Sequence, residues 1–243
     1  MTRFRPAMRL LSLGAFVIPA AYASAQISNS SAVIEYSNIQ YINYTSPVLL
    51  ADNDIQNDPP VTSLSSPSST HVYAAPNGSG TIFTHSAITS FFSATSNTAT
   101  LSGRAFAEAR AFTDDGLDVF QGDASASSYM SLFVNGSGTA TFSLSNMSAG
   151  GNYFSEVMFE LDNTVYSGYT TDTTFTVPLS GGSHTLDVEF FARGYAGIFS
   201  PADASGNVSG DFNVTVNAVP EPASIAALSL GVVGLIKRRK KSQ

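Results

Sequence analysis

The sequence predicts an all-β fold, an antiparallel β-sandwich of the jelly-roll type, with a signal helix at the N-terminus and a transmembrane helix at the C-terminus. Two observations predict the sandwich. Apolar and polar residues alternate with a period of two over several short segments, and turn residues separate these segments at close intervals. Both features are typical of antiparallel sheets that bury one face.

The first 25 residues have the features of a secretory signal peptide. Three arginines precede an apolar run at residues 10–21, and small residues follow at Ala23 and Ala25. Signal peptidase removes a short apolar run that lies between a basic start and small residues. We therefore expect cleavage before Gln26 and export of the remaining chain.

Residues 26–97 are predicted to contribute N-terminal strands and loops to the β body. The segments 32–36 and 39–44 are rich in β-branched and aromatic residues, which favour strands. Three prolines among Asp, Asn and Ser predict a loop at 52–69. A hairpin is expected at 71–84, because an Asn-Gly pair separates two apolar segments there.

Residues 98–218 are predicted to form the core of the sandwich. Alternation directs one apolar set inward in five segments: 139–145, 157–161, 175–179, 186–190 and 212–216. A Ser-Gly-Gly-Ser turn at 180–183 predicts that the third and fourth of these form a hairpin. Residues 102–113 are ambiguous. Their Ala, Glu and Arg content favours a helix, whereas the alternation of alanines with larger residues favours a strand, which we prefer.

Charge is separated along the chain. The formal net charge is −7, but every lysine lies within 237–241. Between residues 26 and 219, three arginines face 17 acidic residues, which gives this part of the chain a charge of −14. A body this acidic repels nucleic acid and anionic lipid, so neither is an expected partner. The chain has no cysteine, so neither a disulfide nor a thiolate metal site is expected.

Residues 219–241 have a composition of their own. The Pro220-Glu221-Pro222 triplet ends the preceding strand, and an uncharged apolar segment follows at 223–236. A basic tail comes next, formed by Lys237, Arg238, Arg239, Lys240 and Lys241. As a helix, the apolar segment spans roughly 21 Å of a hydrocarbon core about 30 Å thick. We therefore predict a short membrane helix with its basic tail on the cytoplasmic side.

The order and spacing of these three parts resemble the PEP-CTERM sorting signal of Gram-negative bacteria. The resemblance implies an exosortase as partner, a membrane transpeptidase that cuts near Pro220, Glu221 and Pro222. It implies that the body is held outside the inner membrane before transfer to the cell surface or the extracellular space. It also implies a cell that produces exopolysaccharide or biofilm. It implies nothing about the β body, because unrelated bodies carry this signal.

No catalytic residues are predicted for the β body. Asp187 and Glu189 lie two residues apart on one strand face, about 7 Å from each other by the strand rise. That spacing is compatible with glycoside hydrolysis. Two acids on an outward face are more often solvated, so a glycoside hydrolase or lyase is the second alternative for the function.

No cofactor is expected either, although an acidic turn leaves structural calcium open. Asp114, Asp115 and Asp118 supply the carboxylate oxygens that hard cations prefer, but they do not match the spacing of an EF-hand loop. The histidines are scattered and form no zinc-binding pattern.

Aromatic rings beside polar groups are the usual contacts of bound sugars. Tyr166, Tyr169 and Tyr195 lie near predicted turns and are candidate ligand-binding residues, as are Phe106 and Phe112 if their face is exposed. The other interpretation is that these rings cover the core. The sequence thus predicts an exosortase-sorted cell-surface or matrix protein without enzymatic activity. The first alternative is a carbohydrate-binding module, with exopolysaccharide as its partner.

Overall fold

A computed structural model describes residues 26–42, 50–57, 61–65, 69–75, 78–114, 118–197 and 203–219. All of them belong to one compact unit, Ser24–Glu221. Within these ranges the chain contains no helix that could span a lipid bilayer. The predicted signal peptide, membrane helix and basic tail lie outside the described residues.

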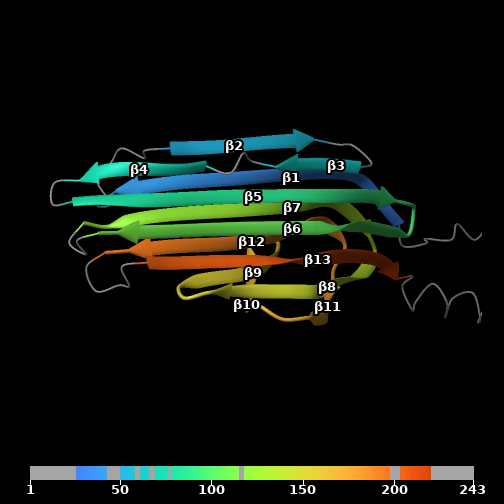
Figure 1. Cartoon of the computed structure of the whole chain (residues 1–243). Coiled ribbons are helices and arrows are strands. Elements are labelled where there is room, and N and C mark those ends of the chain that lie inside the picture. Colours follow the sequence, from blue (N-terminus) through green and yellow to red (C-terminus); the bar gives the residue numbers. More distant parts are fainter. Residues whose placement is uncertain are drawn as a thin grey trace, which may run out of the picture. The chain divides into compact units, whose positions relative to one another are not determined.

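The described residues form two antiparallel sheets (Figure 1). Sheet A has six strands, in the spatial order β10 (Thr164–Tyr169), β9 (Phe154–Leu161), β12 (Gly182–Ala196), β7 (Phe120–Asn135), β1 (Gln26–Ile42) and β2 (Leu50–Asn57). Sheet B has seven strands. They are β11 (Thr173–Leu179), β8 (Ser137–Gly151), β13 (Asp203–Val219), β6 (Thr98–Thr113), β5 (Gly78–Ala94) and β3 (Val61–Ser65), with β4 (Ser69–Ala75) also paired to β5.

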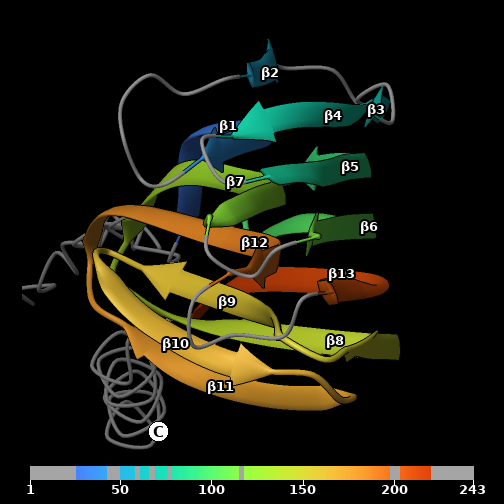
Figure 2. The same cartoon turned by 60° about the vertical axis from the view of Figure 1, so that its left-hand side comes forward.

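The two sheets lie face to face as a sandwich, which confirms the all-β prediction (Figure 2). From β6 to β13 the strand order is β10-β9-β12-β7 in sheet A and β11-β8-β13-β6 in sheet B. Every connection in this part of the chain crosses between the sheets, except the one that joins β9 to β10.

Alternation with a period of two explains which faces are buried. In β6, the side chains of Ala105, Ala107, Ala109 and Ala111 are buried between the sheets, while Arg104 and Arg110 are exposed. The strand interpretation of residues 102–113 is therefore confirmed. Phe142, Phe159 and Phe190 are fully buried in the same core. Burying each such side chain stabilises the fold by about 1.5–3 kcal/mol.

Two local predictions are wrong. The segment 52–69 is not a loop, because most of it forms β2 and β3, which pair with β1 and β5. The segments 175–179 and 186–190 do not form a hairpin, because β11 pairs with β8 in sheet B while β12 lies in sheet A. The turn between them therefore crosses the sandwich. The predicted hairpin at 71–84 is confirmed, with Ala75 opposite Gly78.

A buried polar layer joins the N-terminal strands. It contains three side-chain hydrogen-bonded pairs between facing strands: Gln40 with Thr84 (3.1 Å), Asn38 with Ser86 (3.2 Å) and Ser90 with Ser128 (3.0 Å). The interior between β1, β5 and β7 is thus held partly by hydrogen bonds, which compensate part of the cost of burying these groups.

Candidate functional site: the outer face of sheet A

Strand β12 directs a row of polar and aromatic side chains away from the core. Leu186, Val188 and Phe190 are fully buried, so the residues between and beyond them lie on the outer face of sheet A. Asp187 and Glu189 therefore share that face, as the sequence predicts, and Arg193 lies on the same face. Neighbouring strands add further side chains to the same surface.

Five carboxylates gather around this row: Glu35, Glu156, Glu160, Asp187 and Glu189, here called the acid cluster. They come from three strands. Asp187 lies opposite Glu160 of β9, and its other neighbour is Tyr129 of β7. Glu189 of β12 and Glu35 of β1 face Ser127 of β7 from opposite sides. The tertiary structure thus concentrates negative charge that is dispersed in the sequence.

Asp187 is not a fully solvated acid, contrary to the expectation for an outward strand face. Its side chain is only partly exposed, and Oδ1 is buried without a hydrogen-bond partner among the described residues. Burial raises the pKa of Asp187 to about 7, with a further contribution from the nearby charge of Glu189. The carboxyl group therefore keeps its proton to a much higher pH than an exposed aspartate does.

Burial also raises the pKa of Glu189, and the charges of Glu35, Glu156 and Glu160 act in the same direction. A hydrogen bond from Ser125 opposes this effect. Asp187 and Glu189, the central pair of the acid cluster, thus both resist ionisation, because each is buried and each lies near other negative charges.

Aromatic rings cover the surface beside the acid cluster. Tyr153, Phe154, Phe191 and Tyr195 form what is here called the aromatic platform. The rings of Tyr153 and Tyr195 stack with centroids 5.5 Å apart, and those of Phe154 and Phe191 meet edge to face at 5.9 Å. Tyr153 is 45% exposed and Phe154 is 41% exposed. A patch of large apolar side chains exposed on a protein surface is an informative feature.

The turn that carries Tyr153 is firmly attached to sheet B. The Asn152 side chain accepts a hydrogen bond from the Ser205 backbone N–H at 2.8 Å and donates one to the Asp203 carbonyl at 2.8 Å. The backbone N–H groups of Asn152 and Tyr153 both donate to the Ser205 carbonyl. The platform is thus fixed in position before any ligand arrives, which lowers the entropy cost of binding.

Arg193 gives the platform a polar centre. Its guanidinium donates to both carboxylate oxygens of Asp123, at 2.8 and 2.9 Å, and lies 5.2 Å from the centroid of the Phe191 ring. The Gln121 amide donates to the same carboxylate at 3.0 Å. This bidentate arrangement holds charged and apolar groups side by side in a defined geometry.

The three candidate tyrosines do not form one surface. Tyr195 belongs to the platform, but Tyr166 and Tyr169 are partly buried against the core and contact Phe175, with ring centroids 5.2 and 5.7 Å apart. For these two rings, the interpretation as core cover fits the structure. Sequence reasoning missed Tyr153 and Phe154, although the Gly-Gly-Asn turn before them is a visible signal.

The calcium candidates have other contacts. The carboxylate of Asp114 accepts hydrogen bonds from the backbone N–H and the hydroxyl of Ser79, at 2.7 and 2.8 Å. Asp118 is buried, and Asp115 lies outside the described residues. Among the residues that the structure describes, no group of three His, Cys, Asp or Glu side chains is arranged to hold a metal ion.

These features define the body as an all-β sandwich with an aromatic and acidic outer face. Residues 218–241, which begin in the last two residues of β13, match the family model described as the PEP-CTERM protein-sorting motif. The chain therefore carries a PEP-CTERM motif at its C-terminus, which confirms the resemblance. PEP-CTERM proteins are processed by an exosortase, exported and sorted to the cell surface.

Comparison of the body with known proteins adds little. No curated protein matches the sequence. Among solved structures, the chain is similar to the GH31 alpha-xylosidase from Xanthomonas citri, with 9% identity and a TM-score of 0.20. The match covers 68% of this chain and 35% of that enzyme, so the chain spans about a third of the enzyme's length. A likeness this distant carries no information about function.

Proposed function

We propose that this protein is a non-enzymatic cell-surface protein whose jelly-roll body binds extracellular carbohydrate through the outer face of sheet A. The strand orders β10-β9-β12-β7 and β11-β8-β13-β6 support the jelly roll, because two interleaved Greek keys give this arrangement. The PEP-CTERM motif supports delivery to the outside of the cell.

The observation that carries the proposal is the stacked pair of Tyr153 and Tyr195 beside the Arg193–Asp123 ion pair. A pyranose ring has apolar C–H faces and polar hydroxyl edges. The aromatic rings match the faces, and the fixed charged groups match the edges. The acid cluster nearby, together with the charge of −14 between residues 26 and 219, disfavours anionic polymers. The expected partner is therefore a neutral polysaccharide, such as a neutral exopolysaccharide.

Affinity electrophoresis through gels that contain neutral polysaccharides tests this proposal. We expect at least one of them to retard the protein, and a variant with Tyr153→Ala and Tyr195→Ala to lose that retardation. Phe133→Ala is the matched control, because Phe133 is 39% exposed on the same face of sheet A but lies near the opposite end of β7. Equal retardation of the double variant and the control would show that the aromatic platform does not bind the polysaccharide.

A specific observation favours a second candidate, a glycoside hydrolase or lyase. Asp187, with its pKa raised to about 7, retains a proton for donation to a leaving group near neutral pH. Glu189 is about 7 Å away by the strand rise, close to the carboxyl separation of inverting glycosidases, roughly 6.5–9.5 Å. Assay of released reducing ends over a glycan panel, with Asp187→Asn as the inactive control, tests this candidate. Equal release by both proteins would dismiss it.

A further inference from the structure

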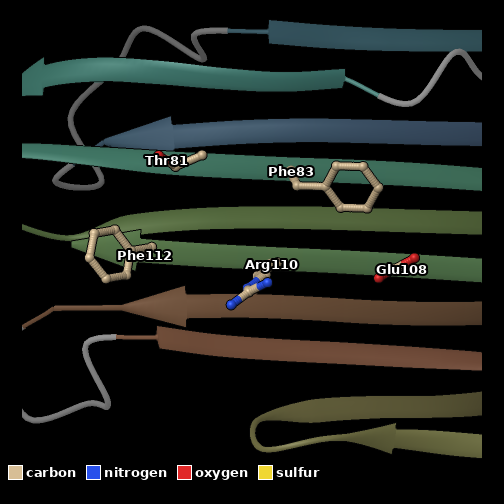
Figure 3. Close-up of a pocket in the computed structure, with 5 residues that line it drawn as sticks. All are labelled: Thr81, Phe83, Glu108, Arg110 and Phe112. Atoms are coloured by element: carbon tan, nitrogen blue, oxygen red, sulfur yellow. The ribbon is translucent and has the colours of Figure 1, made fainter.

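A hollow lies on the opposite side of the sandwich. Five side chains from β5 and β6 line a space of ≈430 Å³ on the outer face of sheet B: Thr81, Phe83, Glu108, Arg110 and Phe112 (Figure 3). Pockets for small molecules commonly enclose about 300–1,000 Å³. The hollow is therefore large enough for one or two sugar rings.

Strand register brings the lining residues together. Thr81 lies opposite Phe112, and Phe83 lies opposite Arg110. Figure 3 shows the Phe83 and Phe112 rings on either side of the hollow, with the Arg110 side chain between them. Phe112 is 42% exposed, so its side chain is accessible to a ligand. The alternation of β6 that buries its alanines is what places Glu108, Arg110 and Phe112 on this outer face.

Arg110 is held in place by Asp203 of β13. Its Nε donates to Asp203 Oδ1 at 2.9 Å, and its Nη2 donates to Oδ2. This bond raises the pKa of Arg110 and lowers the pKa of Asp203. A guanidinium has more N–H donors than this pair uses, so further donors are available to a ligand. Glu108, two residues earlier on the same face, adds a carboxylate acceptor.

We propose that this hollow binds a ring of a neutral saccharide. Arg110, Asp203 and Glu108 together carry one negative charge, so the site does not select an anion. The N–H donors of Arg110 and the carboxylate acceptors of Glu108 match a pair of neighbouring sugar hydroxyls. One hydroxyl would accept a hydrogen bond from Arg110, and the other would donate one to Glu108. The rings of Phe83 and Phe112 match the C–H faces of the sugar. This site lies on the other outer face and stands whether or not sheet A binds carbohydrate.

The test is isothermal titration calorimetry of the full chain in mild detergent, carried out in the Tyr153→Ala and Tyr195→Ala background so that sheet A does not contribute. The probes are cellotriose, xylotriose and maltotriose, with trigalacturonate as the anionic member. We expect one neutral trisaccharide to bind, and Phe112→Ala to weaken that binding by roughly tenfold, about 1.4 kcal/mol. Arg110→Lys keeps the positive charge but loses the planar guanidinium with its several N–H donors, so it should weaken binding as well.

Phe91→Ala is the matched control. Phe91 is 46% exposed on the same face of β5 and does not line the hollow. Since Phe112 and Phe91 are both surface residues, both variants should fold, which circular dichroism checks. Equal effects of the two substitutions, tighter binding of trigalacturonate, or no binding of any neutral trisaccharide would each overturn the proposal.

Discussion

The Nδ1 atom of His184 lies 2.6 Å from Oδ2 of Asp162, and this contact fixes the turn between β9 and β10 to the start of β12. The second ring nitrogen of His184 lies 2.8 Å from the Ser180 carbonyl oxygen. Asp162 also accepts a hydrogen bond from the Thr185 backbone N–H at 2.9 Å. Both ring nitrogens of the buried His184 thus have a hydrogen-bond partner, one in the turn at Asp162 and one at Ser180, and the histidine links these two turns.

Asp162→Ala should destabilise the fold by about 2 kcal/mol, because it removes hydrogen bonds to His184 and Thr185. It also removes a residue type that tolerates the positive φ of 49° at this position. Urea unfolding followed by circular dichroism measures the effect. Asp162→Asn, which keeps an acceptor and tolerates the same φ, should cost less. Equal losses for the two variants would show that the acceptor contributes nothing.

Stability should decrease with pH because of Asp187. Its pKa is 3.8 in the unfolded chain and about 7 in the folded protein, so the folded state binds more protons between these values. The free energy of unfolding therefore falls as the pH rises through this window, and the loss is complete above it. Asp187→Asn should flatten this profile, measured by urea unfolding at several pH values. An unchanged slope in the variant would show that Asp187 titrates normally.

Gly206→Ala should be among the most damaging substitutions in the body. A Cβ atom at this position would lie 1.9 Å from the Phe154 carbonyl oxygen, where β13 meets the start of β9. Overpacking of this kind costs about 3 kcal/mol or more. Gly168→Ala is the control, since its Cβ would meet nothing within 4 Å and only its φ of 86° would be strained. Comparable melting temperatures of the two variants would contradict the close approach.

Tyr169→Ala and Tyr153→Ala should have opposite consequences. Tyr169 contacts the Phe159 and Phe175 rings, so its truncation should cost about 1–3 kcal/mol of stability without changing carbohydrate binding. Tyr153 is exposed, so its truncation should weaken binding and leave stability nearly unchanged. Thermal unfolding and affinity electrophoresis of the same two proteins separate these effects. Loss of carbohydrate binding in a folded Tyr169→Ala variant would show that Tyr169 contributes to binding and not only to packing.

Sorting should depend on the prolines of the PEP triplet. A variant with Pro220→Ala and Pro222→Ala should remain uncut in the inner membrane of a cell that has an exosortase, because the recognition segment is altered. Immunoblots of membrane and extracellular fractions measure the outcome. Substitution of Ser242, beyond the basic tail, is the control and should leave processing intact. Normal release of the double variant would show that the exosortase does not require the two prolines of the triplet.

Local pattern was enough to predict some strands of the sandwich, among them β6, β8 and β9, but not β2, β3, β7 or β10. The alternation around Phe142 and Phe159 encodes which face is buried, and the alanines of β6 reveal a strand despite their helical propensity. Strand pairing is a long-range property, however. Nothing near the Ser-Gly-Gly-Ser turn at 180–183 signals that β12 enters the other sheet.

The candidate site was predictable only in part, for the same reason. Asp187 and Glu189 lie two residues apart on one strand, so the alternation of side chains along a strand predicts that they share a face. Their partners Glu35 and Glu160 come from strands far away in the sequence. The raised pKa of Asp187 is caused mainly by burial in the assembled sheet and by the charge of Glu189, with smaller contributions from these two partners. The buried pair of Asn38 and Ser86 was equally hidden, because each residue alone is typical of a loop.

The position of β13 has a mechanical consequence. This strand lies between β6 and β8, is paired on both sides along most of its length, and ends at Val219, immediately before the Pro220-Glu221-Pro222 triplet. Tension applied at that end acts along the strand axis, in the shearing direction. The ladder bonds on both flanks then bear the force together instead of opening one by one like a zipper. A body tethered through this strand is suited to resist flow or pulling.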